Sequence, residues 1–349
     1  MNILNDKALF ASLTLGAETV TFSEEGAYPE RLLPKEKESY VANGRHPARV
    51  GATAGMRLSF VTDSPRFTLG ILICNETELK DRAAIDIKVN GKYIGSIANF
   101  TEDGKALFPD GTVTEVEPRN YPNGSYKKEF FLGEGEKSVS IYLAYPTKTL
   151  VTELSVEDGA TVRPNRPRLR HLIYGDSITH GYCATHPLRT YIAILDDYLD
   201  AESFHKGIDG GTYFAPIAAS APDREYDLVT VAYGTNDWNR VPFDTFAKES
   251  SEFLSILASR YPKAKIYVLT PTWRADCAPK DRPKGAMSDY CEFLAAECDK
   301  YSNMRVIHCI DFIPHDPAMF DDAYLHPNDD GFAHYAKGLV QAIGADFKA

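Results

Sequence analysis

The stretch LRHLIYGDSITHG, residues 169–181, opens with an apolar run and then turns to Gly-Asp-Ser. An apolar run without alternation is typical of a strand that is buried on both faces of a parallel sheet. Three later runs have the same character, at residues 228–233, 266–269 and 306–310. Together the four runs predict the strands of one buried sheet.

Helical patterns lie between these runs. One covers residues 243–261, and another covers residues 287–300, where apolar residues recur at helical spacing. A last helix is expected from about Asp329, because the Asn- and Asp-rich segment there can cap a helix. Strands that alternate with helices predict an α/β domain whose parallel sheet has helices on both faces.

The first half of the chain has a different rhythm. Apolar and polar residues alternate at residues 56–62, 85–89 and 139–143, and Asn90-Gly91 signals a hairpin turn after the second run. No stretch of helical period stands out before about residue 185. Short alternating strands separated by turn residues predict an antiparallel β-sandwich.

The length of 349 residues fits two domains better than one. Between the two rhythms lies EDGATVRPNRPR, residues 157–168, a polar stretch with two prolines that is typical of a linker. We therefore predict a β-sandwich domain at residues 1–160, a linker at residues 161–168 and an α/β domain at residues 169–349.

Composition excludes several classes of partner. The net charge is −11 and there is no Lys/Arg block, which argues against nucleic-acid binding. No apolar run approaches the roughly 20 residues that cross a bilayer, and residues 1–20 lack the basic-then-apolar pattern of a signal peptide. The six cysteines form no CxxC pair. These features predict a cytoplasmic protein with reduced thiols and no membrane association.

Chemistry-bearing residues follow the buried runs. Ser177 comes directly after the first run, Asn236 follows the second, and Asp322 and His326 precede the last helix. In open α/β sheets, ligands bind beyond the carboxyl ends of the strands, so these side chains are expected to meet at one edge. A histidine can take the proton of a serine hydroxyl, a carboxylate can orient that histidine, and an asparagine can stabilise an oxyanion. The pattern predicts acyl transfer.

In this combination the residues resemble the SGNH (GDSL-like) hydrolase family. Four segments carry the resemblance, namely GDSIT at residues 175–179, the Gly-rich KGIDGG at residues 206–211, GTND at residues 234–237 and HPN at residues 326–328. The resemblance covers about residues 169–349. It implies a flavodoxin-like three-layer fold, with Ser177 as the nucleophile.

The resemblance also implies roles for the other residues. His326 matches the base and Asn236 matches an oxyanion donor, beside the backbone N–H of Ser177. Gly210 is the better match to the oxyanion glycine, and Gly207 is the alternative.

The spacing of the acid departs from the family. The family usually has an aspartate three residues before the histidine, where this chain has Ala323, and Asp322 is four residues before. Either a bulge in the loop brings Asp322 to the ring of His326, or the site works as a Ser–His dyad. We favour Asp322.

The order of a β-rich domain and an SGNH-like domain is similar to that of two-domain carbohydrate acetyl-esterases and of GDSL acyltransferases. This similarity implies a jelly-roll-like sandwich, and we expect it to shape the pocket rather than to bind glycan by itself. The predicted activity is hydrolysis of a small-molecule or oligosaccharide ester, with O-acetyl groups on a carbohydrate as the expected substrate. The alternatives are transfer of the acyl group to an alcohol, and a catalytically silent glycan-binding protein.

Three further residues are candidates for contact with substrate. Trp273 and Arg274 follow a buried run, where Arg274 can bind an anionic group, and His180 lies close to Ser177. The competing interpretations are a surface salt bridge for Arg274 and an exposed position for His180.

No cofactor or metal is predicted. The acidic segments around His315 and Asp329 lack the spaced ligands of calcium and zinc sites. There is no P-loop, no GxGxxG and no GxSxG motif. Asp176 and Asp237 are expected to hold their loops by accepting backbone N–H groups.

Overall fold

The computed structural model describes residues 1–75, 81–117, 119–277 and 285–347. Its contacts divide the chain into two compact units, of which the first comprises Met1–Leu32, Gly51–Pro167 and Thr185–Leu188 and the second the remainder. Both units are therefore discontinuous along the sequence, whereas the predicted domains are continuous. Thr185–Leu188 belongs with the first unit because the His186 ring and the Leu188 N–H hydrogen-bond to Asp86.

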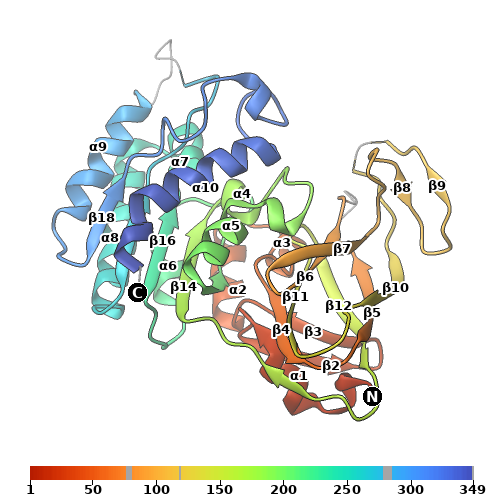
Figure 1. Cartoon of the computed structure of the whole chain (residues 1–349). Helices are drawn as coiled ribbons and strands as arrows, with labels where there is room; N and C mark the ends of the chain where they lie inside the picture. The colour runs from red at the N-terminus through yellow and green to blue at the C-terminus, as the bar shows by residue number, and fades with distance from the viewer. Residues whose placement is uncertain (76–80, 118, 278–284, 348–349) are drawn as a thin grey trace. The chain divides into compact units, whose positions relative to one another are not determined.

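The first unit is a sandwich of two antiparallel sheets (Figure 1). One sheet has the order β1-β4-β11-β6-β7, with β13 paired to β4, and its strands are Thr14–Leu15, Arg57–Thr62, Lys137–Tyr142, Ala84–Val89, Lys92–Ala98 and Val162–Pro164. The other has the order β10-β5-β12-β3-β2, with strands Gly124–Phe131, Arg66–Cys74, Lys148–Val156, Gly26–Glu30 and Thr19–Ser23. A small ribbon joins β8 and β9, Ala106–Leu107 and Val113–Thr114.

The alternating pattern places one face of each strand in a shared apolar core. Phe60 of β4 and Phe67 of β5 are buried in that core, as are Ile87 of β6 and Val139 of β11. The predicted hairpin is confirmed, since β6 and β7 pair around Asn90-Gly91. The predicted antiparallel sandwich is likewise confirmed.

Three short α-helices before residue 51 were not predicted. They are α1 (Lys7–Leu13), α2 (Pro34–Ala42) and α3 (Pro47–Val50). α2 is mostly polar, so it carries no apolar stripe that would reveal it, and local signals define it instead. Pro34 occupies its first turn and Glu36 accepts the Leu33 N–H at 2.7 Å. Within the expected linker, residues 162–164 form β13, because they extend the sheet at β4.

The second unit contains a five-stranded parallel sheet in the order β15-β14-β16-β17-β18. The strands are, in chain order from β14, Leu169–Gly175, Ala201–His205, Leu228–Ala232, Lys265–Leu269 and Met304–Ile307. The order reverses between β14 and β16, and ligands of such sheets bind at this switch point, beyond the carboxyl ends of the strands. The predicted flavodoxin-like arrangement is confirmed.

Helices cover this sheet in two groups (Figure 1). The longer ones are α5 (Tyr191–Leu199), α8 (Phe243–Arg260), α9 (Met287–Cys298) and α10 (Asp329–Ile343), and the shorter ones are α4 (Ser177–His180), α6 (Ala215–Ala219) and α7 (Thr235–Arg240). α5 packs on α10, while α8 packs on α6 and α9. α2 joins this unit by packing on α6.

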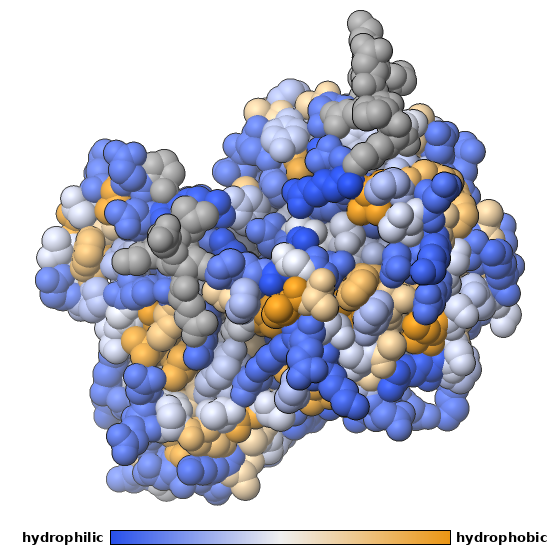
Figure 2. All heavy atoms as spheres, turned by 180° about the vertical axis from the view of Figure 1, so that it is seen from behind, coloured by the Kyte–Doolittle hydropathy of each residue, from blue (hydrophilic) through white to orange (hydrophobic). Residues whose placement is uncertain are grey.

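The surface in Figure 2 is mainly hydrophilic, with hydrophobic residues in small groups between the polar ones. Within the described ranges, every helix is too short or too polar to cross a bilayer. None of the six cysteines, all within the described ranges, forms a disulfide, and Cys298 and Cys309 are buried.

Candidate active site

Ser177 begins helix α4, directly after strand β14. Asp176 caps this helix by accepting the Ile178 N–H at 3.0 Å. The helix ends after one turn at Gly181. The strand, the cap and the short helix together present the Ser177 hydroxyl at the carboxyl edge of the sheet, at the switch point between β14 and β16.

Ser177, His326 and Asp322 form a continuous chain of hydrogen bonds. Ser177 Oγ lies 2.9 Å from His326 Nε2, and His326 Nδ1 lies 2.6 Å from Asp322 Oδ2. The carboxylate can only accept, so Nδ1 carries the ring proton and Nε2 is left to accept the serine proton. This is the geometry of a nucleophile, a base and an orienting acid.

A compact loop brings Asp322 to the histidine. Asp322 Oδ1 accepts the backbone N–H groups of Tyr324, Leu325 and His326 at 2.8–3.1 Å. Ala323 has a φ of 61°, in the left-handed region that non-glycine residues seldom adopt. This one left-handed residue makes the bulge that compensates for the unusual spacing. The structure thus favours a triad over a dyad.

The environment keeps Asp322 ionised. Burial alone raises the pKa of its carboxyl, but the hydrogen bonds from the His326 ring and from three backbone N–H groups outweigh burial and hold the pKa well below its usual range. A carboxylate that stays charged across the neutral range can stabilise a protonated His326.

Tyr182 was not identified from the sequence. Its ring packs edge-on against the His326 ring, with centroids 4.7 Å apart, and its N–H donates to the Ser177 carbonyl at 2.9 Å. The only signal in the sequence is its position five residues after Ser177, beyond the one-turn helix. The Tyr182 ring therefore limits the movement of the imidazole on one side.

The Gly-rich segment lies next to the junction of β14 and α4, where the Ile208 N–H donates to the Gly175 carbonyl at 3.0 Å. Neither the backbone N–H of Ser177 nor that of Gly210 donates a hydrogen bond to another described residue. Asn236, at the start of α7, is buried, and its Nδ2 donates to the Gly211 carbonyl at 3.1 Å, which ties the carboxamide to the Gly-rich segment. Gly210 has a φ of 72°, which favours glycine. These features favour Gly210 over Gly207.

The family model of the GDSL-like Lipase/Acylhydrolase family matches residues 173–334, a range that contains Ser177, Gly210, Asn236 and the Asp322–His326 pair. The chain carries a GDSL-like acylhydrolase domain. It is therefore an ester-hydrolysing enzyme. No curated protein matches the sequence.

Solved structures share the fold of the whole chain, at identities of 20% or less. The salicylyl-acyltransferase SsfX3 from a tetracycline biosynthetic pathway has 20% identity and a TM-score of 0.77, over 95% of this chain and 94% of that one. A putative GDSL-like lipase from Bacteroides ovatus has 19% identity and a TM-score of 0.69, over 97% of both chains. A family two carbohydrate esterase from Clostridium thermocellum, in complex with cellohexaose, has 14% identity and a TM-score of 0.62, over 95% and 98%.

Two buried carboxyls of the acylhydrolase domain hold its loops. Asp176 accepts the Ile178 N–H, and Asp237 accepts the Tyr213 N–H at 3.0 Å. Burial raises the pKa of Asp176 to about 7, and burial, with a contribution from the charge of Asp176, raises the pKa of Asp237 to about 7. Their hydrogen bonds are the loop-holding ones that the sequence predicts.

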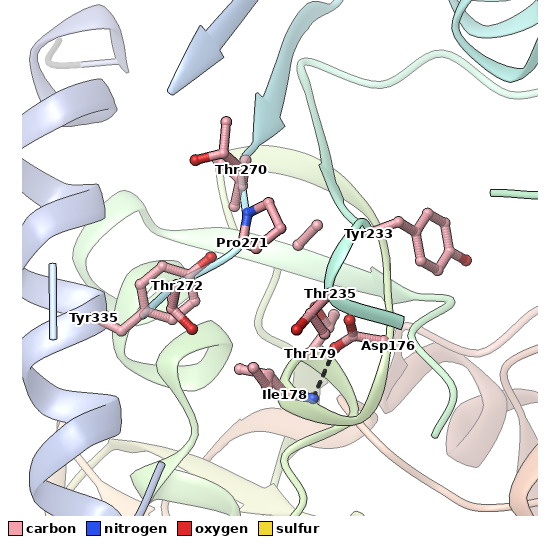
Figure 3. Close-up of a pocket in the computed structure, with 11 residues that line it drawn as sticks. Asp176, Ile178, Thr179, Tyr233, Thr235, Thr270, Pro271, Thr272 and Tyr335 are labelled. Carbon is pink, nitrogen blue, oxygen red and sulfur yellow. Dashed lines mark hydrogen bonds between the residues drawn. The ribbon is translucent and has the colours of Figure 1, made fainter. Parts of the chain in front are cut away.

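A cavity of about 20 Å³ lies behind this edge of the acylhydrolase domain. Its lining mixes polar and apolar residues, which Figure 3 shows around the ends of the neighbouring strands, among them Asp176, Ile178, Thr179, Tyr233, Thr235, Thr270, Pro271, Thr272 and Tyr335. The volume suits about one water molecule and is too small for an ester. A cavity of this size does not hold the acyl group.

The remaining predicted contacts with substrate have other partners in the structure. Arg274 is buried: its Nε and Nη2 donate to Asp276, and its Nη1 donates to the carbonyl and hydroxyl oxygens of Thr235. Since these bonds occupy the guanidinium, Arg274 braces the start of α7 and is not free for an anionic substrate group. Trp273 stacks on His315, with centroids 5.3 Å apart.

His180 is buried, which excludes the alternative of an exposed position. Its Nδ1 accepts the Asp209 N–H at 3.3 Å, so it supports the Gly-rich segment. Over the described ranges, no three side chains of the His, Cys, Asp and Glu types are grouped as metal ligands.

Proposed function

We propose that the protein hydrolyses small O-acyl esters through an acyl-enzyme on Ser177, with O-acetyl groups on carbohydrates as the substrate class. The observation that carries this proposal is the unbroken hydrogen-bond chain from Ser177 through His326 to Asp322, beside two backbone N–H groups without partners in the described chain.

The proposed reaction has two half-reactions. Ser177 Oγ attacks the acyl carbonyl while its proton passes to His326 Nε2, and the Ser177 and Gly210 N–H groups and Asn236 stabilise the oxyanion. The intermediate collapses, and His326 returns the proton to the departing alcohol oxygen. Water then attacks the acyl-enzyme with His326 as base, which releases the acid and restores the serine hydroxyl.

The carbohydrate part of the proposal is supported by likeness alone. The Clostridium thermocellum esterase, which matches over 95% of this chain and 98% of its own, is described in complex with cellohexaose. A second activity deserves equal testing, since the likeness in fold to a salicylyl-acyltransferase favours transfer of the acyl group to an alcohol. The two activities share the acyl-enzyme and differ only in the acceptor that attacks it.

The first experiment labels the nucleophile. Wild-type protein incubated with a fluorophosphonate is expected to gain one adduct, which maps to Ser177, while Ser177→Ala gains none. Ser220→Ala, a half-buried serine of the same unit, is the control and is expected to label like wild type. Folded wild-type protein that gains no adduct at Ser177 contradicts the proposal.

The second experiment identifies the substrate and the acceptor. Acetylated sugars are incubated with wild type and Ser177→Ala, with and without excess alcohol, and free acetate and transferred ester are both measured. Hydrolysis predicts acetate in equal yield with and without the alcohol. A transferred ester as the main product supports the acyltransferase instead, and turnover by Ser177→Ala contradicts both.

A further inference from the structure

The Gly-rich segment of the acylhydrolase domain is braced by residues that lie far upstream in the sequence. Leu33–Val50 belongs to the same compact unit as the sheet of that domain. Glu36 forms a buried ion pair with Lys206 at 3.0 Å, and the Tyr40 hydroxyl donates to the Lys206 carbonyl. Glu36 and Tyr40 lie outside the range of the family model, and they hold one end of the segment that bears Gly210.

Arg45 reaches the middle of the same segment. Its Nη1 donates to the Asp209 carbonyl at 3.2 Å, while Nε and Nη2 donate to the Asn43 carbonyl at 3.2 and 3.0 Å. Its backbone N–H donates to the Tyr40 carbonyl at 2.9 Å, at the end of α2. The guanidinium is thus fixed at three nitrogens, and only one of them serves the Gly-rich segment.

The peptide between Asp209 and Gly210 links the Arg45 contact to the Gly210 N–H. The C=O of Asp209 and the N–H of Gly210 belong to one planar trans peptide, in which they point in opposite directions. A donor that fixes the carbonyl therefore also fixes the direction of the N–H. The other side of Asp209 is fixed too, since its own N–H donates to His180 Nδ1.

We propose that Arg45 is a positioning residue of the oxyanion hole: by binding the Asp209 carbonyl it holds the Gly210 N–H in the direction in which it donates to the oxyanion. This inference rests on the proposed function, because it needs Gly210 to be a donor. It adds to the site a residue that comes from outside the acylhydrolase motifs.

Gly210 itself fits this role in a second way. A Cβ at this position would overlap Nη1 of Arg45, so the glycine allows the guanidinium to approach the peptide. The same point lies 3.5 Å from Nη1 of Arg240, which is exposed at the end of α7. Burial and the charge of Arg240 lower the pKa of Arg45. The hydrogen bonds of Arg45 and the opposite charge of Asp209, which acts to raise the pKa of Arg45, hold the guanidinium here against this repulsion.

The test compares three full-length variants with wild type. Arg45→Met keeps the length of the side chain without its donors, Arg45→Lys keeps one charged donor, and Arg240→Met removes the neighbouring charge but no hydrogen bond to Asp209. We expect Arg45→Met to lower kcat about 10- to 100-fold with KM within about two-fold, because a misaligned donor loses part of the transition-state stabilisation that a deleted donor loses entirely. Arg45→Lys is expected to recover part of kcat, and Arg240→Met to resemble wild type.

The rate of fluorophosphonate labelling gives the second readout, because the phosphonyl oxygen uses the same donors. Arg45→Met is expected to reach one adduct per chain at Ser177, but more slowly than wild type. An unchanged kcat and labelling rate in folded Arg45→Met overturns the inference, and so does an equal loss in Arg240→Met, which would mean that charge alone acts. Wild type that never labels overturns the proposed function instead, so the two failures are distinguishable.

Discussion

The two carboxylate oxygens of Asp322 make different contacts around His326. Oδ2 contacts the imidazole, while Oδ1 gathers three backbone N–H groups of the loop that follows. The carboxylate therefore builds the loop and orients the base at the same time. From the sequence, Ser177 and Asn236 were identified by their places after buried runs, and His326 by its place before the last helix. The reach of Asp322 was left open, because it depends on the left-handed backbone of Ala323, which has no signature in composition or periodicity.

The first prediction at the residue scale concerns Asp322→Asn. The amide keeps an oxygen for the backbone N–H groups but presents an NH₂ group to Nδ1, which favours the tautomer with the proton on Nε2. His326 then cannot accept the serine proton. We expect kcat to fall by about 10²- to 10⁴-fold with little change in KM, measured with an activated acetyl ester.

Asp321→Asn is the matched control. This neighbour is exposed, and its contact within the loop is a backbone one, from its N–H to the His326 carbonyl at 2.9 Å. Its kcat is expected to stay within about two-fold of wild type. Equal losses in the two variants would show that general charge near the loop matters, and not the contact with Nδ1.

At the scale of elements, periodicity and capping signals predicted four of the five parallel strands and the helices α8, α9 and α10, but not β15 (Ala201–His205) or α5 (Tyr191–Leu199). The four buried runs became β14, β16, β17 and β18, and the alternating runs became strands of the sandwich. α2 was missed because its sequence is mostly polar, and it becomes a helix through its capping residues and its packing on α6. Its ion pair joins Glu36 to Lys206, 170 positions along the chain, and no local pattern indicates such a partner.

The second prediction concerns this ion pair, whose side chains are 0% and 1% exposed for Lys206 and Glu36. Lys206→Met leaves a buried carboxylate without its cation, and we expect a loss of about 3–5 kcal/mol in the free energy of unfolding. Lys206→Met/Glu36→Gln removes both charges, while the glutamine still accepts the Leu33 N–H that caps α2. The double variant is expected to regain at least half of the loss.

Urea unfolding of the two variants and wild type measures these values. A double variant as unstable as Lys206→Met would mean that the lysine stabilises the Gly-rich segment by packing, without a charge effect. Kinetics on the double variant, at temperatures where it is folded, would then show whether the position of that segment has changed.

At the scale of the whole molecule, the hydrophobic pattern of each half of the sequence predicts the fold class of the corresponding unit. The site lies where the strand order of the parallel sheet reverses. The division of the chain was harder to foresee. Leu33–Val50 lies in the sequence between parts of the sandwich but belongs to the second unit. Thr185–Leu188 lies in the sequence between parts of the α/β unit but belongs to the first. Contacts such as those of His186 and Leu188 with Asp86 decide this, and they depend on tertiary structure.

The acylhydrolase domain also carries a pH dependence of stability at Asp237. Its carboxyl has a pKa of about 7 in the folded chain because of burial, against 3.8 as its ordinary value. In the unfolded chain the group ionises near 3.8, so unfolding releases a proton between these values and this group makes the fold less stable as the pH rises from about 4 to about 7. Above about 7 the destabilisation is constant.

Asp237→Asn removes this dependence while keeping an oxygen for the Tyr213 N–H. The difference in unfolding free energy between the variant and wild type is expected to be larger at pH 8 than at pH 5 by about 1–3 kcal/mol. The corresponding difference in Tm is expected to be larger at pH 8 by about 2–9 °C. Asp223→Asn, at an exposed position, is expected to give the same difference at both pH values. If the Asp237→Asn difference is equally flat, the carboxyl is ionised in the fold at both pH values and the buried site tolerates its charge.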